Sequence, residues 1–78
     1  MRTSAKQRSD LKAIGRRIKE LRAAERQDDF APFLGITQGH LSKIERGTQA
    51  PTVEVLLRLR ERFGKSVDWI LVGEEQKR

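Results

Sequence analysis

Apolar residues recur at helical spacing in the first third of the chain, three or four positions apart. A helix over this segment would bury them along one side and leave the charged residues in water. Ser9 or Asp10 stands just before the stripe, where a helix N-terminus needs a side-chain oxygen as a cap. The apolar stripe consists of Leu11, Ile14, Ile18 and Leu21. The pattern therefore predicts a first helix that begins after residue 9 or 10.

A second, shorter apolar pattern ends at a glycine. Phe30, Ala31 and Leu34 fall at positions i, i+1 and i+4, which a short helix places on a single side. Gly35 comes next and can take the positive φ that ends a helix without a steric penalty. The pattern predicts a second helix that stops at this glycine.

Pro32 lies inside this second pattern and limits where the helix starts. Proline lacks the amide hydrogen that an inner helical residue donates, so it is harmless only in the first turn. With Asp28 or Asp29 as the N-cap, Pro32 would be the fourth or third helical residue. The sequence therefore predicts a late start and a short second helix.

A third helical pattern follows at once. Thr37 is a good N-cap, and Leu41 and Ile44 would bury one side of the helix, with Ile36 as an apolar anchor before it. The opposite side is polar and consists of Gln38, Gly39, Ser42, Lys43 and Arg46. Two short helices joined by a tight turn, the second with a polar outer face, are typical of a helix-turn-helix that binds DNA.

Two further helices complete the predicted fold. Thr52 caps a helix that Gly64 ends, and Ser66 caps a last short helix with Ile70 in the core. The residues predicted to be buried in the first of these helices are Leu56, Leu59 and Phe63, helped by Val53 and Leu57. The chain shows no alternating strand pattern and no internal repeat, so the predicted fold class is all-α with five helices.

Several ordered motifs span about residues 11–73. The residues in the centre are Gln27, Ala31, Gly35, Ile36, Leu41 and the run 44–47, with flanking motifs at residues 14–22, 51–52, 56–57 and 66–73. Together they resemble the lambdoid phage repressors, the Cro proteins and the XRE-type regulators. The resemblance implies a compact five-helix, lambda-repressor-like DNA-binding domain with a helix-turn-helix.

The resemblance also implies roles for particular residues. In the family, the glutamine matching Gln27 often braces the base-contacting residue, here Gln38, and contacts phosphate. The residues matching Arg22 and Glu45 form a structural ion pair between the third and first helices. The family often dimerises through the last helix and the loop before it. The residues expected at this dimer interface are Val67, Trp69 and Leu71, with Trp69 shared between interface and core.

The polar side of the third helix carries the candidates for base contact. A side-chain amide at a helix N-terminus can pair bidentately with adenine, which makes Gln38 the strongest of them. Lys43 is assigned equally to a phosphate or a base, and Arg46 equally to phosphate or solvent. The predicted DNA-binding residues are Gln27, Thr37, Gln38, Gly39, His40, Ser42, Lys43, Arg46, Thr48, Arg16 and Arg17.

The placement of charge is informative. The 78 residues have a formal net charge of +6, and residues 1–26 hold nine of the 17 basic residues but only three of the 11 acidic ones. The surplus of basic residues in this segment suits phosphate binding by counterion release. It equally suits a helix and tail whose charges are merely solvated.

We expect residues 1–9 to be a flexible basic arm, residues 10–73 the DNA-binding domain and residues 74–78 a charged tail. Similar arms wrap the DNA in some phage repressors, and an arm without function is the other reading.

Other classes of protein are not expected. One histidine, His40, and no cysteine provide neither a metal site nor a catalytic site, so we expect no enzyme, metal or cofactor. No apolar run approaches the ~20 residues of a membrane span, and the N-terminus lacks the apolar core of a signal peptide. These features favour a cytoplasmic protein.

The sequence thus predicts a regulator of transcription that binds double-stranded DNA sequence-specifically. We expect a homodimeric repressor of a pseudo-palindromic operator, with a recognition helix at about residues 37–46. The alternatives are an antitoxin-type protein-interaction module with a toxin as its partner, and a restriction-modification controller protein.

Overall fold

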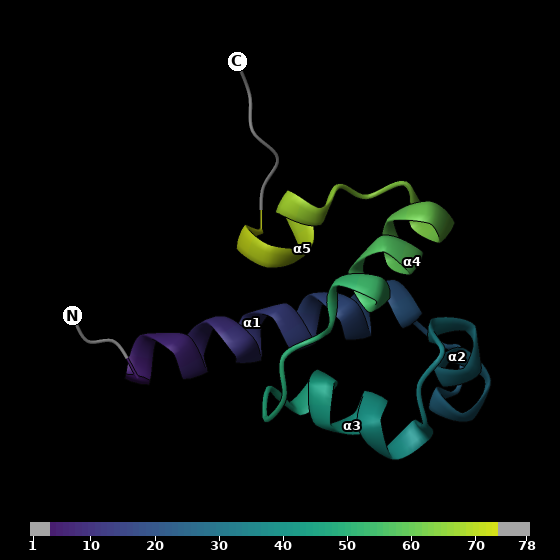
Figure 1. Cartoon of the computed structure of the whole chain (residues 1–78), viewed down its shortest axis with the longest axis horizontal. Helices are drawn as coiled ribbons and strands as arrows, with labels where there is room; N and C mark the ends of the chain where they lie inside the picture. The colour runs from purple at the N-terminus through teal and green to yellow at the C-terminus, as the bar shows by residue number, and fades with distance from the viewer. Residues whose placement is uncertain (1–3, 74–78) are drawn as a thin grey trace.

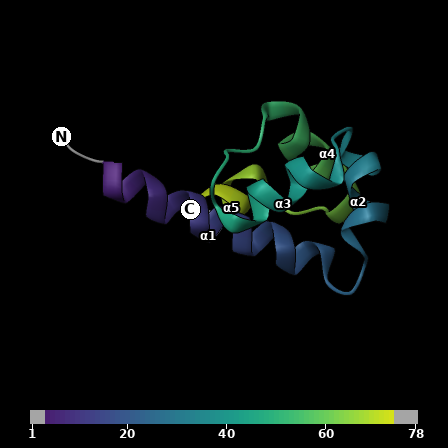
Figure 2. The same cartoon turned by 90° about the horizontal axis from the view of Figure 1, so that it is seen from below.

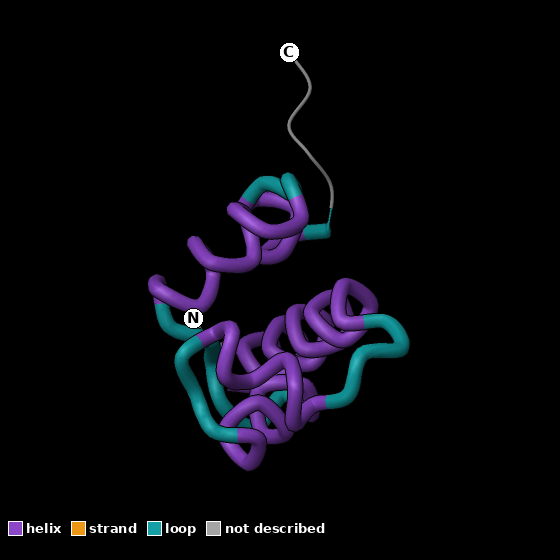
Figure 3. The backbone as a smooth tube through the Cα atoms, turned by 90° about the vertical axis from the view of Figure 1, so that its right-hand side faces the viewer, coloured by secondary structure: helices purple, strands orange, loops and turns teal. Residues whose placement is uncertain are grey.

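Five α-helices joined by short loops make up the computed structural model, which describes residues 4–73 (Figure 1). The helices are α1 (Ser4–Arg22), α2 (Gln27–Leu34), α3 (Gln38–Arg46), α4 (Val53–Phe63) and α5 (Val67–Val72). Figure 3 shows only helix and loop in this part of the chain, so the predicted all-α class is confirmed. Within residues 4–73, no helix combines the length and the apolar character needed to cross a membrane.

The longest helix, α1, runs across the molecule, with α3 on one side of it and α4 and α5 on the other (Figure 1). α2 packs against both α3 and α4. Seen from below, the N-terminal part of α1 extends beyond the other helices (Figure 2). One core joins all five helices and consists of Ile14, Ile18, Phe30, Ala31, Leu34, Leu41, Ile44, Val55, Leu56, Leu59 and Ile70.

The start of α1 differs from the prediction. The helix begins at Ser4, so a start after Ser9 or Asp10 is wrong, and residues 4–9 of the predicted flexible arm are helical. Residues 4–9 contain no glycine or proline and are rich in good helix formers, so nothing in the sequence stops the helix at the candidate caps. Residues 1–3 of the arm and the charged tail at 74–78 lie outside the described residues.

The start of α2 also differs. The helix begins at Gln27 with Arg26 as its N-cap, so the predicted late start is wrong, although the helix is short at eight residues. Pro32 is therefore the sixth helical residue. Asp28 and Pro32 are both exposed, so the Asp28 carbonyl, which has no amide of residue 32 to accept from, can bond to water instead.

The other helix boundaries predicted from capping residues are confirmed. Gly35 ends α2 with φ 77°, and the Thr37 hydroxyl accepts a hydrogen bond from the amide of His40 at 3.0 Å. Thr52 and Ser66 cap α4 and α5 in the same way. Each cap satisfies an amide that the first helical turn leaves without a partner.

The buried face of α4 differs in part from the prediction. Val53 and Leu57 are 71% and 45% exposed, so the prediction that they help to fill the core is wrong. Val55 is buried instead, beside Leu56 and Leu59. Val53 and Leu57 are four positions apart and share the outer side of the helix, because one turn separates them.

Candidate nucleic-acid interface

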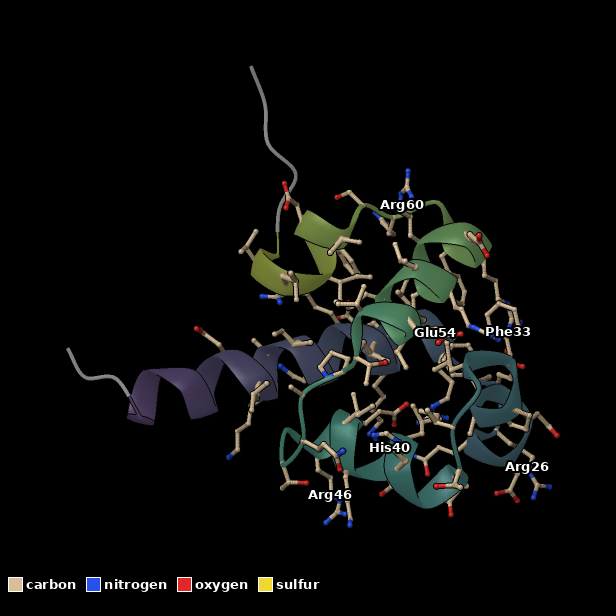
Figure 4. All side chains as sticks on the ribbon, in the orientation of Figure 1. Arg26, Phe33, His40, Arg46, Glu54 and Arg60 are labelled. Carbon is tan, nitrogen blue, oxygen red and sulfur yellow. The ribbon has the colours of Figure 1, made fainter. Side chains whose placement is uncertain are left out.

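The outer side of α3 is turned toward solvent. Gln38, Gly39, Lys43 and Arg46 are exposed, and Ser42 is half-buried. Figure 4 shows the Arg46 side chain pointing away from the body of the protein, and its Nε donates a hydrogen bond to the Ser42 carbonyl at 3.3 Å. Amides, hydroxyls and cations on an exposed helix side are the groups that base edges and phosphates bind.

Gln27, the first residue of α2, connects α2 to the N-terminal end of α3. Its Oε1 accepts a hydrogen bond from Nε2 of Gln38 at 2.6 Å. Its Nε2 donates to Oε1 of Glu45 at 2.8 Å. The two glutamines, assigned to one interface by the sequence, are therefore brought together by the fold. A side chain already held in place loses less conformational entropy when it contacts a base.

Glu45 and Arg22 form the ion pair between α3 and α1 that the resemblance implies. Arg22 Nε lies 2.7 Å from Glu45 Oε2, and Arg22 Nη2 donates to Oε1 at 2.8 Å. Only 12% of the arginine side chain and 4% of the glutamate side chain are exposed. Hydrogen bonding to Glu45 raises the pKa of Arg22 although burial opposes it, so the arginine stays charged.

Backbone contact between α1 and α3 occurs at two glycines. A Cβ on Gly15 would overlap the carbonyl oxygen of Ile44 and lie 2.5 Å from that of Glu45. A Cβ on Gly47, which ends α3 with φ 83°, would lie 2.7 Å from Cα of Lys12. Gly15 was not among the predicted site residues, but a glycine in the middle of a helix is itself a signal of close packing.

The loop after α3 closes back onto the helix. The amide and the hydroxyl of Thr48 both donate to the Lys43 carbonyl, at 3.0 and 3.1 Å. His40 Nε2 lies 3.0 Å from Nε2 of Gln49, so the imidazole hydrogen-bonds to this loop. His40 and Thr48, both predicted to contact DNA, thus lie where α3 meets the exposed loop.

Arg16 and Arg17, which the sequence grouped together, lie in different surroundings. Arg16 is exposed on α1. Arg17 Nη1 donates to the carbonyl of Ile70 in α5 at 2.8 Å, and its guanidinium lies against Gly73. A helix C-terminus carries partial negative charge, so the cation suits this position. Arg17 therefore links α1 to α5, away from the outer side of α3.

The residues predicted for the dimer interface differ in exposure. Val67 and Trp69 are half-buried and pack against the core, while Leu71 is 38% exposed. Ile70 is fully buried, as predicted, and Val72 is 58% exposed. The exposed part of α5 is thus apolar at its C-terminal end.

Arg62 forms a structural contact that sequence reasoning missed. Its guanidinium carbon lies 5.3, 4.8 and 5.2 Å from the ring centroids of Phe30, Phe33 and Phe63. Its Nη2 also donates to Glu25 at 2.8 Å. The arginine thus holds α4 against α2 and the turn that follows α1. Glu25 is 37 positions away in the sequence, so no local pattern signals the pair.

An all-α domain whose α2 and α3 are joined by a glycine turn, with α3 exposing a polar side, is a helix-turn-helix domain. A family model described as helix-turn-helix matches residues 18–70, from the C-terminal part of α1 into α5. The chain belongs to this family and is a DNA-binding regulator of transcription of the XRE type. No curated protein and no solved structure gave a significant match.

Proposed function

We propose that this regulator is a repressor that binds a pseudo-palindromic operator as a homodimer, with α3 in the major groove of each half-site. The placement of Gln38 carries the proposal. Gln38 is exposed, is the first residue of α3 and is held by Gln27. An amide in this position suits the edge of adenine, and base contacts of this kind give a repressor its sequence specificity.

Exposed cations near α3 support contacts with the DNA backbone. Arg16, Lys43 and Arg46 are exposed, and the N-terminal end of α3 adds the partial positive charge of a helix N-terminus. The loop with Thr48 and Gln49 is also exposed beside the helix. Contacts of this kind position the protein on DNA and make binding dependent on salt.

The apolar end of α5 supports a dimer. Leu71 and Val72 are exposed, and Trp69 is only partly covered by the core. A two-fold dimer that reads two half-sites must hold its two α3 helices about 34 Å apart, one helical turn of DNA. Leu71→Lys should give a monomer by analytical ultracentrifugation, with little change in thermal stability because the side chain is exposed. If the variant stays dimeric, Leu71 is not part of the dimer interface.

Selection of binding sites from random duplex DNA tests the whole proposal. It should be done at about physiological salt, since weak phosphate binding fades as salt rises. Enrichment of a two-fold symmetric site would support the dimeric regulator and give the half-site spacing. Placing that site over a reporter promoter then separates repression from activation. If no site is enriched, the proposal is wrong.

One observation favours the alternative of an antitoxin-type module. An open groove between α2 and α4 is lined by Phe33, Val53, Glu54, Leu57, Arg58 and Glu61, none of them on α3. Figure 4 labels two residues of this groove, Phe33 from α2 and Glu54 from α4. Exposed apolar side chains can mark a protein-binding surface. A protein that selects no DNA site should therefore be tested for a protein partner at this groove.

A further inference from the structure

The hydrogen bonds that lead from α1 to Gln38 have a fixed direction. Glu45 is a buried carboxylate, and both of its oxygens accept hydrogen bonds from Arg22. A carboxylate held by a guanidinium can only accept. Gln27 must therefore turn its NH₂ group toward Glu45, and Nε2 does donate to Oε1 at 2.8 Å.

This requirement passes on to Gln38. Because Nε2 of Gln27 points at Glu45, its Oε1 faces Gln38 and can only accept there. Gln38 must then donate from its own Nε2, as it does at 2.6 Å. A glutamine side chain in water could turn its amide either way, but the buried carboxylate leaves this one a single arrangement.

What remains on Gln38 is one N–H group and the oxygen Oε1. Adenine presents an acceptor, N7, and a donor, the N6 amino group, in the major groove. Guanine presents two acceptors, O6 and N7. The arrangement in the structure matches adenine, whereas the opposite arrangement, with Oε1 of Gln38 bonded to Gln27, would present two N–H groups and match guanine.

We propose that the Arg22–Glu45 pair, acting through Gln27, fixes the order of donor and acceptor on Gln38 and so makes adenine the base that α3 selects. This inference rests on the proposed function. Gln27 and Glu45 are positioning residues for a contact that Gln38 alone makes. The ion pair thus serves specificity as well as packing.

The test begins with the binding site selected by the wild-type protein. Gln38→Ala identifies the base pair that Gln38 contacts, because preference should relax at that position alone. Gln27→Met keeps the length of the side chain but cannot accept from the amide of Gln38. Competition binding should then show the preference for adenine over guanine at that position falling about tenfold. Preferences at the other positions of the site are the internal control.

Exchanging the side chains of residues 27 and 45 should restore the preference that Gln27→Met loses. In the double variant Gln27→Glu with Glu45→Gln, residue 27 is again only an acceptor toward Gln38, and the amide at position 45 can donate to it. The preference for adenine should return toward the wild-type value. Thermal unfolding of each variant establishes that it is folded before its preference is measured.

The outcomes separate the two ideas. If the wild-type protein selects no sequence, the proposed function fails and this inference fails with it. If a site is selected but Gln38→Ala relaxes a position that prefers guanine, only the inference is overturned. A uniform loss of affinity in Gln27→Met, with the ratio of adenine to guanine unchanged, also overturns it, because that result indicates a phosphate contact.

Discussion

The two halves of α3 are held in different ways. In the C-terminal half, Ile44 and Glu45 are buried, and α1 comes into backbone contact with them at Gly15. In the N-terminal half, a Cβ on Gly39 would meet no atom of the described residues within 4 Å, and Gln38 is exposed. The C-terminal half therefore fixes the orientation of the helix against α1, and the first two residues of the helix are left accessible.

Glu45→Ala should have the largest effect on the buried half. It removes the carboxylate and leaves Arg22, whose side chain is 12% exposed, without its charged partner. Loss of one member of a buried pair costs about 3–5 kcal/mol, a large part of the stability of a small domain. Chemical denaturation should show this loss. Because hydrogen bonding to Glu45 raises the pKa of Arg22, the contribution of its charge to stability is present at neutral pH and is lost only in strongly alkaline solution, above the pKa that arginine has in an unfolded chain.

Glu54→Ala is the matched control for that loss. Glu54 also pairs with an arginine, Arg58, at 2.8 Å, but the two side chains are 69% and 42% exposed. Exposed pairs contribute about 0–1 kcal/mol. Equal losses in the two variants would contradict the view that burial makes the Arg22–Glu45 pair important.

Gly15→Ala should have the next largest effect. The new methyl group would overlap backbone oxygens of Ile44 and Glu45, which cannot move aside as a flexible side chain can. Overpacking of this kind costs roughly 1–3 kcal/mol and outweighs the ~1 kcal/mol that alanine gains over glycine within a helix. The midpoint of urea unfolding should fall. A midpoint that rises would show that α1 and α3 can separate at little cost.

Gly39→Ala is the same substitution on the accessible half, and its effect on stability should have the opposite sign. The methyl group has space, and alanine stabilises a helix interior by up to ~1 kcal/mol relative to glycine. Urea unfolding should show a small rise in midpoint. Affinity for the selected site, measured on the same samples, then shows whether the DNA approaches the backbone at Gly39. A stable variant that binds as well as the wild type would mean that it does not.

Local signals predicted much of the fold. The caps at Thr37, Thr52 and Ser66 and the glycine turn at Gly35 depend on residues three or four apart, so a linear pattern contains them. The late start predicted for α2 was wrong because a proline inside a helix is tolerated where the carbonyl that it leaves unpaired can bond to water. The sequence does not show that Pro32 is exposed.

Parts of the site that depend on tertiary contacts were harder to predict. Helical spacing puts Arg17, three residues after Ile14, beside the buried stripe, but only the position of α5 shows that Arg17 bonds to Ile70. Val53 and Leu57 are four residues apart, as are the buried Val55 and Leu59. Only the packing therefore shows which side of α4 the core covers. The chain of bonds through Gln27 likewise joins three helices, and pattern alone does not give its direction.

Arg16 and Arg17 provide the smallest and most specific test, because they are neighbours with the same charge. We expect Arg16→Gln to leave stability unchanged and to make the slope of log K against log salt shallower by about 0.9, the value for one phosphate contact. Arg17→Gln should leave that slope unchanged and lower stability slightly, since it loses a bond to the end of α5. Both slopes come from fluorescence anisotropy titrations on one duplex at several salt concentrations. If Arg17→Gln changed the slope and Arg16→Gln did not, the DNA would contact the side of α1 next to α5, and the proposed docking of α3 would be wrong.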